Sequence, residues 1–376
     1  MNLEYIESKK VLVRFDFNVP MDGDRIVNDF RIKQSLETIY KLLDKNNKIL
    51  IASHLGRPKE GKFDKTLSLR PICIYLSELI DKKIKFIDTW PDKIDFENYQ
   101  IAMLENVRFN IGEKSCSEEL SEKISSYVDC FVFDAFGVAH RQECTTYGVS
   151  KYLKTYFGIN IQNEIQTIKK LINENSKPMT IIISGAKVST KLIVIKKLLN
   201  KCDHMILGGG ILNTFLKARG YEIGQSLFEE GLIDEAKSIL QTDVASKIIF
   251  PTDLICESNS VTKNIELNSL GDKDTIYDIG DDSINHIKDI IRKSSSIFWN
   301  GPLGYIEKKP YDTGTIELAK VIADHKCFSI VGGGDTLPII ENLKLQNKYS
   351  CLSTGGGSLL TYLEGGSLPI LRELNI

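Results

Sequence analysis

Three glycine triplets each follow an apolar run, at residues 208–210, 332–334 and 355–357. Glycine lets the backbone turn tightly and approach a ligand closely. Where a helix follows such a turn, its free N–H groups and positive dipole end can bind an anion. A single triplet is equally compatible with an ordinary turn between a strand and a helix. Three of them in one chain favour phosphate binding.

The second triplet has the most informative surroundings. Apolar residues 327–331 predict a buried strand, and Asp335 and Thr336 are favourable N-cap residues after the glycines. Pro338 fits the first turn of the helix expected there. Asp335 also supplies a carboxylate that a magnesium–phosphate complex could use. The segment therefore predicts a phosphate site with a metal-binding carboxylate.

A further phosphate loop is expected near residue 187. An apolar strand over residues 180–183 leads into Ser-Gly-Ala-Lys-Val-Ser-Thr-Lys, and a helix is expected over 192–199. Small residues, a hydroxyl N-cap, and Lys187 and Lys191 suit phosphate, although the motif GxxxxGK[ST] is absent. Farther along, Glu307 follows a Gly-Pro segment. Its carboxylate could bind ribose hydroxyls or could simply cap a turn.

Arginine is concentrated in the first half of the chain. Seven of the ten arginines precede residue 142, namely Arg14, Arg25, Arg31, Arg57, Arg70, Arg108 and Arg141. Arginine binds carboxylate and phosphate groups through paired N–H donors. A lone arginine is usually a solvated surface charge, but here four of them lie in or just after expected strands. Together with Arg31, His54 and His140, they predict a cationic surface for a small, highly charged anion. Both histidines could equally be structural hydrogen-bonding residues.

The elements that carry these residues alternate between strands and helices. Strands are expected over residues 11–20, 48–52, 101–104, 130–133, 180–183, 205–207, 248–250, 296–299 and 327–331. Helical spacing separates them, for example over 29–43, 69–79 and 117–127. This rhythm predicts an α/β fold with parallel sheets, whose ligands bind at the carboxyl ends of the strands. Asp16 and Asn18 are two residues apart and share one face of the first strand.

The chain has 376 residues and a mass of 42.4 kDa, enough for two domains with separate cores. Residues 158–176 have helical spacing followed by a polar run, which predicts a connecting helix and hinge. The first domain is expected over residues 1–157, with a C-terminal tail, about 366–376, returning to it. The second is expected over 177–365.

The net charge of −2 gives no support for nucleic-acid binding, and no apolar run reaches the roughly 18 residues of a membrane helix. The N-terminus lacks an apolar signal core, so a cytoplasmic protein is expected. The eight cysteines form no CxxC pair, which favours free thiols over disulfides or a zinc site.

Nine sequence blocks in this order resemble phosphoglycerate kinases of the bacterial type, and the likeness runs nearly end to end. They are VRFDFNVP (13–20), ASHLGRP (52–58), LENVRFN (104–110), DAFGVAHR (134–141), GAKVSTKL (185–192), LGGGILNTF (207–215), FWNGPLG (298–304), VGGGDT (331–336) and STGGGSLLTYLEGG (353–366). The resemblance implies two similar-sized Rossmann-like domains joined by a helix. It also implies reversible phosphoryl transfer between 1,3-bisphosphoglycerate and MgADP, giving 3-phosphoglycerate and MgATP, in glycolysis. The enzyme would be a cytoplasmic monomer without nucleic-acid or membrane partners.

The resemblance assigns roles to residues in the matched blocks. The phosphoglycerate would be bound in the first domain by Asp16, Asn18, Arg31, His54, Leu55, Gly56, Arg57, Arg108 and Arg141. The nucleotide would be bound in the second domain by Lys187, Lys191, Glu307, Gly333, Gly334, Asp335 and Thr336, with Asp335 on the Mg²⁺ side. Catalysis would depend on Arg31, Lys191 and the helix N-termini at Gly334 and Gly357.

A carboxylate acceptor is already ionised near neutral pH, so this reaction needs no general base. It needs alignment and positive charge on the oxygens of the transferred phosphoryl group. Closure about residues 158–176 would bring the substrates together and exclude water.

Four features depart from the family pattern. Thr190 stands where many members have Asp, Phe133 replaces a frequent Asn, Leu337-Pro338 follows GGGDT, and the joint over 159–165 is unusually polar. Two alternatives remain open. The first is a two-domain dehydrogenase, which would leave the arginines unused and would require a GxGxxG turn after a strand that this chain lacks. The second is a non-catalytic phosphate-binding or scaffolding protein with this fold, which would show no turnover.

Overall fold

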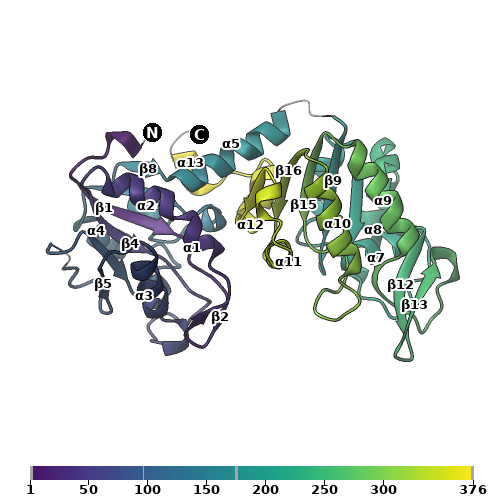
Figure 1. Ribbon diagram of the computed structural model, residues 1–376, viewed down its shortest axis with the longest axis horizontal. Coiled ribbons are helices and arrows are strands. Elements are labelled where there is room, and N and C mark those ends of the chain that lie inside the picture. Colours follow the sequence, from purple (N-terminus) through teal and green to yellow (C-terminus); the bar gives the residue numbers. More distant parts are fainter. Residues whose placement is uncertain (1–2, 96, 174–176, 374–376) are drawn as a thin grey trace. The chain divides into compact units, whose positions relative to one another are not determined.

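The computed structural model describes residues 3–95, 97–173 and 177–373 (Figure 1). The chain divides into two compact units, one comprising Met1–Ile165 with Gly366–Ile376 and the other Gln166–Gly365. We call them unit 1 and unit 2. The division falls inside helix α5 (Ile159–Asn173), and residues 174–176 of the expected connecting segment lie outside the described residues. Within the described ranges, no helix is long and apolar enough to cross a membrane.

Unit 1 contains a six-stranded parallel sheet in the order β5-β6-β4-β1-β7-β8. Its strands are β1 (Lys10–Phe15), β4 (Lys48–Ala52), β5 (Ile84–Ile87), β6 (Ile101–Leu104), β7 (Cys130–Asp134) and β8 (Thr155–Phe157). The central strands are mostly apolar and, apart from Lys10 and Lys48 at the starts of β1 and β4, buried, as expected of a parallel sheet covered on both sides. A short antiparallel ribbon, β2 (Met21–Asp22) with β3 (Arg25–Ile26), lies outside the sheet.

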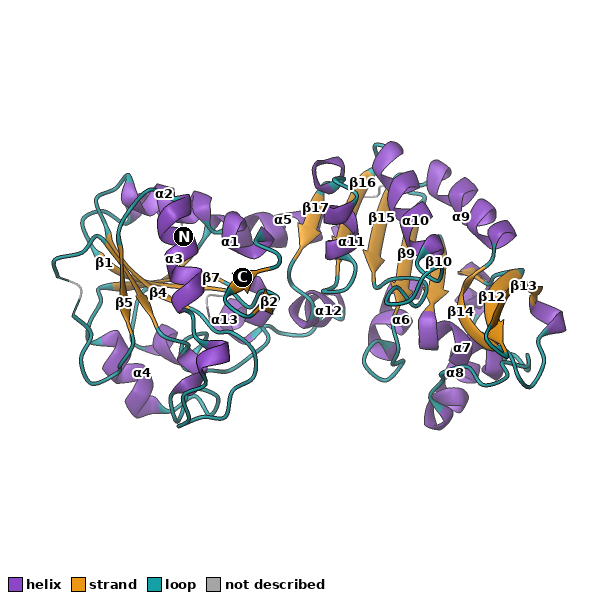
Figure 2. Cartoon of the chain, turned by 60° about the horizontal axis from the view of Figure 1, so that its bottom comes forward, coloured by secondary structure: helices purple, strands orange, loops and turns teal. Residues whose placement is uncertain are grey.

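Helices cover both faces of this sheet. They are α1 (Phe30–Gln34), α2 (Leu36–Leu43), α3 (Arg70–Leu79), α4 (Glu118–Ser125) and the C-terminal α13 (Pro369–Glu373). Buried residues of α1, α2 and α3 share one core with one face of β1 and β4, while α4 lies on the opposite side (Figure 2). The single helix expected over 29–43 is interrupted at Ser35. Its hydroxyl donates to the carbonyl oxygen of Ile32 at 2.7 Å, a local bond that competes with continued α-helical pairing.

Unit 2 contains a second six-stranded parallel sheet, ordered β11-β10-β9-β15-β16-β17. Its strands are β9 (Met179–Ser184), β10 (His204–Gly208), β11 (Ile248–Ile249), β15 (Ser296–Asn300), β16 (Phe328–Gly332) and β17 (Cys351–Ser353). The helices are α6 (Leu192–Leu199), α7 (Gly209–Ala218), α8 (Ile233–Leu240), α9 (Asp281–Lys293), α10 (Thr313–Asp324), α11 (Leu337–Asn342) and α12 (Gly357–Leu363). Figure 2 shows α9 and α10 on one side of this sheet and α6 and α8 on the other. The expected α/β fold with two parallel sheets is confirmed.

Unit 2 also contains an antiparallel sheet that the sequence did not predict, ordered β13-β12-β14. Its strands are β12 (Asp253–Ser258), β13 (Val261–Glu266) and β14 (Thr275–Ile279). Nearly every residue of β13 is exposed, so this strand lacks the apolar alternation by which strands are recognised. The hairpin turn at Asn259 and Ser260 has positive φ values of 51° and 62°, the conformation of a type I′ turn.

The start of α5 is anchored to the sheet of unit 1 by Asp134 at the end of β7. One carboxylate oxygen accepts from the backbone N–H of Ile161 at 2.8 Å, and the other accepts from the Thr38 hydroxyl at 2.5 Å. The Thr38 oxygen in turn accepts from the N–H of Ile159 at 2.8 Å. Burial raises the pKa of Asp134 to about 6, against the opposing effect of these hydrogen bonds. A side chain at Gly158 would not fit, because its Cβ would lie 2.1 Å from Cγ of Asp134.

We therefore expect Gly158→Ala to lower the free energy of unfolding by about 1–3 kcal/mol, because the added methyl group must displace Asp134 or the start of α5. Urea unfolding followed by circular dichroism would measure the change. Gly231→Ala is the matched control, since its Cβ would meet no atom within 4 Å. An unfolding midpoint for Gly158→Ala equal to that of the control would contradict the role of this close contact.

Candidate active site

The carboxyl ends of β1 and β4 bring together Asp16, His54 and Arg31. Asp16 and His54 are buried, and Arg31 of α1 donates from Nη1 to Oδ2 of Asp16. His54 Nδ1 lies 3.9 Å from Oδ1 of Asp16. Burial and four nearby guanidiniums, those of Arg14, Arg108, Arg31 and Arg141, hold the pKa of His54 well below its usual value. The imidazole is therefore neutral at pH 7.

Arg14 is fully buried and contacts this histidine. Its Nη2 lies 3.2 Å from Nδ1 of His54, and its Nε donates to the Thr145 hydroxyl at 3.1 Å. A guanidinium can only donate, so Nδ1 of His54 accepts and the ring proton is on Nε2. Burial lowers the pKa of Arg14, whereas Glu113 acts to raise it. The sequence marked Arg14 as one of the recurrent arginines but assigned it no substrate role.

Arg108 and Arg141 are joined by a buried carboxylate that the sequence analysis did not identify. Nη2 of Arg108 donates to Glu143 at 3.1 and 3.4 Å, and Nη1 of Arg141 lies 3.4 Å from the same carboxylate. Nη1 of Arg108 donates to the carbonyl oxygen of Gly56 at 2.9 Å. Burial lowers the pKa of Arg108, and Glu143 opposes this shift. The Nε atoms of both arginines are buried without a hydrogen-bond partner, so each retains a donor for a ligand.

The loop after β4 contacts both Asn18, which follows β1, and Arg108. Oδ1 of Asn18 accepts from the N–H of Gly56 at 2.8 Å, and Gly56 has a positive φ of 61° that favours glycine. The carbonyl oxygen of Leu55 accepts from Asn106 at 2.7 Å. Arg57 is exposed beside this turn. Burial, followed by the charge of Arg141, lowers the pKa of His140 on the neighbouring loop.

Unit 2 presents a different kind of site, centred on Lys191 immediately before α6. Its ammonium donates to the carbonyl oxygen of Ser184 and lies 3.5 Å from that of Asn300, at the ends of β9 and β15. Cβ atoms added at Gly185 or Gly301 would each lie 3.3 Å from Nζ, so both glycines leave space beside the ammonium. Burial lowers the pKa of Lys191 to about 8, and the Asp335 carboxylate partly opposes this shift.

The glycine triplet at 332–334 lies at the same strand edge. The Asn300 amide donates to the carbonyl oxygen of Gly332 at 3.0 Å, and Gly333 has a φ of 120°. Gly334 and Asp335 are exposed in the turn that leads into α11. Thr336 is the N-cap residue, but its side chain makes no capping bond, and its buried hydroxyl has no hydrogen-bond partner. The turn therefore presents backbone N–H groups together with one exposed carboxylate.

The other two triplets differ in their surroundings. A Cβ at Gly209 would lie 2.9 Å from the carbonyl oxygen of Gly185, and one at Gly210 would lie 2.3 Å from that of Ala186. Close backbone packing thus accounts for the first triplet, and α7 (Gly209–Ala218) begins within it. In the third triplet, Gly357 is exposed at the start of α12.

Glu229, another residue missed from the sequence, holds the loop between Lys187 and Lys191. Its carboxylate accepts from the N–H and the hydroxyl of Ser189, both at 2.8 Å. Thr190 bonds within the loop, donating to the carbonyl oxygen of Lys187 at 2.9 Å. Glu229 thus supplies a loop-ordering carboxylate from a distant part of the chain. Lys187 and Glu307 are both exposed, and Glu307 lies outside this set of contacts.

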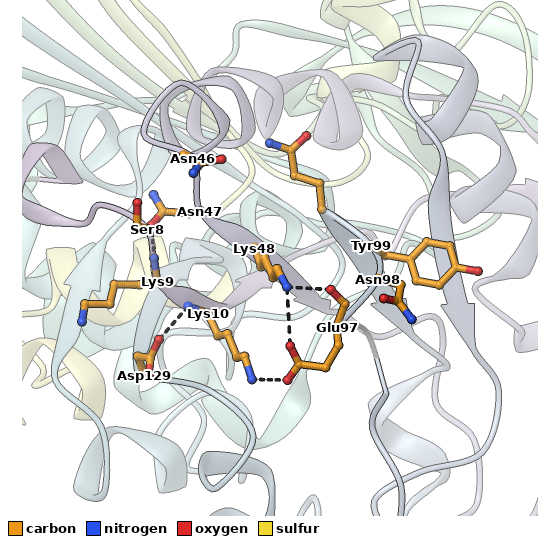
Figure 3. Close-up of a pocket in the computed structure, with 11 residues that line it drawn as sticks. Ser8, Lys9, Lys10, Asn46, Asn47, Lys48, Glu97, Asn98, Tyr99 and Asp129 are labelled. Atoms are coloured by element: carbon orange, nitrogen blue, oxygen red, sulfur yellow. Dashed lines mark hydrogen bonds and ion pairs between the residues drawn. The ribbon is translucent and has the colours of Figure 1, made fainter.

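A cavity of about 570 Å³ lies at the opposite edge of the unit 1 sheet, where β1 and β4 begin (Figure 3). The lysines Lys10 and Lys48 converge there on the exposed carboxylate of Glu97. None of the residues assigned to substrate or nucleotide lines this cavity. The size of this cavity therefore does not identify it as the reaction site.

Comparisons with known proteins agree across the chain. The model of a family described as phosphoglycerate kinase matches residues 2–366. Phosphoglycerate kinase of Francisella philomiragia is 42% identical over 378 aligned residues, covering 98% of this chain and 96% of that protein. The Baumannia cicadellinicola enzyme of the same name is 41% identical over 373 residues, with 98% and 96% coverage.

Solved structures lead to the same conclusion. Phosphoglycerate kinase from Coxiella burnetii matches with a TM-score of 0.86 at 37% identity, covering 98% of this chain and 96% of that chain. The Pyrococcus horikoshii enzyme also has a TM-score of 0.86, at 29% identity and with the same coverage. The resemblance indicated by the nine sequence blocks is confirmed. Because the family is one of kinases, the dehydrogenase alternative is excluded. The chain belongs to the phosphoglycerate kinase family.

Proposed function

We propose that this chain interconverts 1,3-bisphosphoglycerate and MgADP with 3-phosphoglycerate and MgATP, the reaction of its family, using one substrate site in each unit. The observation that supports this division best is the arginine cluster of unit 1. Four guanidiniums influence a single buried histidine at the carboxyl edge of the sheet. Such a concentration of fixed positive charge suits a small ligand bearing both phosphate and carboxylate groups.

In unit 1, the ligand's phosphate would be bound by the unpartnered Nε donors of Arg108 and Arg141. His54 would donate from Nε2, because its Nδ1 is engaged by Arg14. Asn18, Leu55, Gly56 and Arg57 would complete the site. Asp16 would position Arg31, with which it forms an ion pair.

In unit 2, the nucleotide phosphates would lie against Lys191, the backbone N–H groups of residues 333–335 and the Thr336 hydroxyl, with Lys187 and Glu307 at the exposed margin. Asp335 is a single exposed carboxylate, and the described residues contain no group of three His, Cys, Asp or Glu side chains suited to a metal. This fits Mg²⁺, which commonly binds through one or two carboxylates together with substrate phosphates. When bound, Mg²⁺ would neutralise phosphate charge.

The chain's own groups would then supply alignment and positive charge to the phosphoryl group in transfer. Arg31 and Lys191 are the side chains assigned to this task, with the turn at Gly334 that leads into α11 and the start of α12 at Gly357. No general base is needed, because the acceptor is a carboxylate. Since each unit is assigned one substrate, transfer would require a domain closure that brings the ligands together and excludes water.

A coupled assay with 3-phosphoglycerate and MgATP tests the reaction, and lack of turnover by folded protein would favour the scaffolding alternative. As the family resemblance implies, we assign the activity to a cytoplasmic monomer without nucleic-acid or membrane partners. Analytical ultracentrifugation checks the monomer.

Arg31→Ala should lower kcat by about 10²–10³-fold while changing nucleotide affinity little, because loss of one transition-state charge donor has this typical cost. Arg25→Ala is the control, since Arg25 is exposed in the same unit and forms an ion pair with the exposed carboxylate of Asp22. A kcat equal to that of the wild type would exclude the catalytic role.

Asp335→Asn should weaken binding of MgADP and MgATP and leave 3-phosphoglycerate binding nearly unchanged, because only the nucleotide site uses this carboxylate. Isothermal titration calorimetry measures both affinities. Equal loss of both in a folded variant would contradict the division between the two units.

Affinity for MgATP should fall as the pH rises through about 8, because the free protein then loses the ammonium charge of Lys191. In Lys191→Met, binding should be weaker and this pH dependence should disappear. Lys196→Met, on the exposed face of α6, should retain the wild-type profile. Identical pH profiles for Lys191→Met and the wild type would show that another group titrates.

A further inference from the structure

The carboxylate of Glu143 lies in the interior of the arginine site, where its negative charge opposes an anionic ligand. Its side chain is only 5% exposed, and that of Arg108 is 3% exposed. We propose that Glu143 is a positioning residue that pairs Arg108 with Arg141 and, as an internal anion, limits their affinity for phosphate. The identity of the ligand rests on the function proposed above.

The first part of this role follows from the hydrogen bonds. Both oxygens of Glu143 accept from Nη2 of Arg108, at 3.1 and 3.4 Å, and Oε1 also lies 3.4 Å from Nη1 of Arg141. The two guanidiniums repel each other, and the charge of Arg141 adds to burial in lowering the pKa of Arg108. A carboxylate shared between them offsets that repulsion and fixes their separation. Without it, the empty site would hold two adjacent positive charges, that of Arg108 buried and that of Arg141 partly exposed.

Glu143 is itself held in place by the main chain around it. Its N–H donates to the hydroxyl of Thr146 at 3.1 Å, and its carbonyl oxygen accepts from the N–H groups of Tyr147 and Gly148 at 2.9 and 3.1 Å. The next residue, Cys144, donates from its N–H to the carbonyl oxygen of Glu113 at 2.9 Å. The carboxylate therefore projects from an anchored turn, and it can act as a fixed reference for both arginines.

The second part follows from the donors that remain. Nε of Arg108 and Nε of Arg141 are buried and have no hydrogen-bond partner. A phosphate that accepts from either Nε would lie on the same guanidinium that Glu143 already contacts. Two anions on one guanidinium repel each other, and the burial of Glu143 and Arg108 reduces the screening of that repulsion. Glu143 thus opposes the ligand that its two arginines attract.

Substitution can separate positioning from charge. Glutamine at 143 keeps an oxygen acceptor of the same reach, and Arg108 keeps its bond to the carbonyl oxygen of Gly56 at 2.9 Å. The guanidiniums should therefore remain close to their positions while the opposing charge is lost. Alanine removes both the charge and the shared acceptor, and it leaves space beside Arg108.

The test is isothermal titration calorimetry of the full chain with 3-phosphoglycerate and, separately, with inorganic phosphate. E143Q should bind both about tenfold more tightly than the wild type, and E143A should bind both more weakly than E143Q. The KM for 3-phosphoglycerate should fall in E143Q without a rise in kcat. MgADP affinity should not change, because the nucleotide is assigned to unit 2.

The matched control is E97Q, the same chemical change in the same unit at the opposite edge of the sheet (Figure 3). Glu97 is 61% exposed and pairs with Lys10 and Lys48, so its replacement should leave both affinities unchanged. If E97Q tightened binding as much as E143Q, a general increase in net charge would explain the result and the proposal would be wrong.

Equal or weaker binding of both anions by folded E143Q would also overturn the proposal. E143D gives a second test that does not depend on that variant: it retains the charge, and its affinity should not exceed that of the wild type. Tighter binding by E143D would contradict the inference. If the wild type did not bind 3-phosphoglycerate but the variants showed the expected affinities for inorganic phosphate, the proposed function would be refuted. The role proposed for Glu143 would still be supported.

Discussion

Repulsion among closely spaced guanidiniums is the main constraint on unit 1. Burying an arginine is costly unless it is paired and hydrogen-bonded, and here several are gathered around one histidine. The chain meets this constraint with separate carboxylates: Asp16 pairs with Arg31, and Glu143 joins Arg108 to Arg141. The cationic surface that suits a phosphoglycerate is therefore built on an interior layer of negative charge.

Unit 2 gathers positive charge in another way. Its strand edge uses one lysine, Lys191, together with N–H groups of turns and helix starts. Partial charges on the backbone do not repel one another as guanidiniums do, so this site requires close backbone approach. Gly185 and Gly301 leave space around the ammonium, and the glycines at 209 and 210 allow the neighbouring turn to pack closely. Both proposed anion sites therefore gather positive charge, unit 1 through the full charges of guanidiniums and unit 2 mainly through peptide dipoles.

The difference explains what could be predicted from the sequence. Parallel strands direct their carboxyl ends to one edge, so Asp16, His54 and Arg108 could be grouped before the structure was known. Glu143 and Glu229 could not, because Arg108 is 35 residues from Glu143 and Ser189 is 40 residues from Glu229, and no sequence pattern connects either pair. The strand β13 was missed for a different reason, since its exposed polar residues carry no burial pattern.

The interior carboxylates also determine how the site responds to acid. Glu113 is buried, and its pKa is raised to about 7 by desolvation, with the hydrogen bond from Thr145 and the charge of Arg14 opposing that shift. Since an unfolded glutamate ionises near 4.5, the folded chain retains a proton between about pH 4.5 and 7 that the unfolded chain releases. The contribution of Glu113 to stability therefore decreases as the pH rises through that range.

Thr145 links this titrating carboxylate to the site. Its hydroxyl donates to Glu113 at 2.6 Å and accepts from Nε of Arg14 at 3.1 Å, and Arg14 contacts Nδ1 of His54 at 3.2 Å. Protonation of Glu113 below pH 7 removes negative charge behind Arg14, and the uncompensated guanidinium makes protonation of His54 still less favourable. The histidine is thus kept neutral, with its proton on Nε2, over the range in which an isolated imidazole would become charged. Compensation of buried arginine charge therefore determines both the arrangement of these side chains and the protonation state in which His54 would contact the proposed ligand.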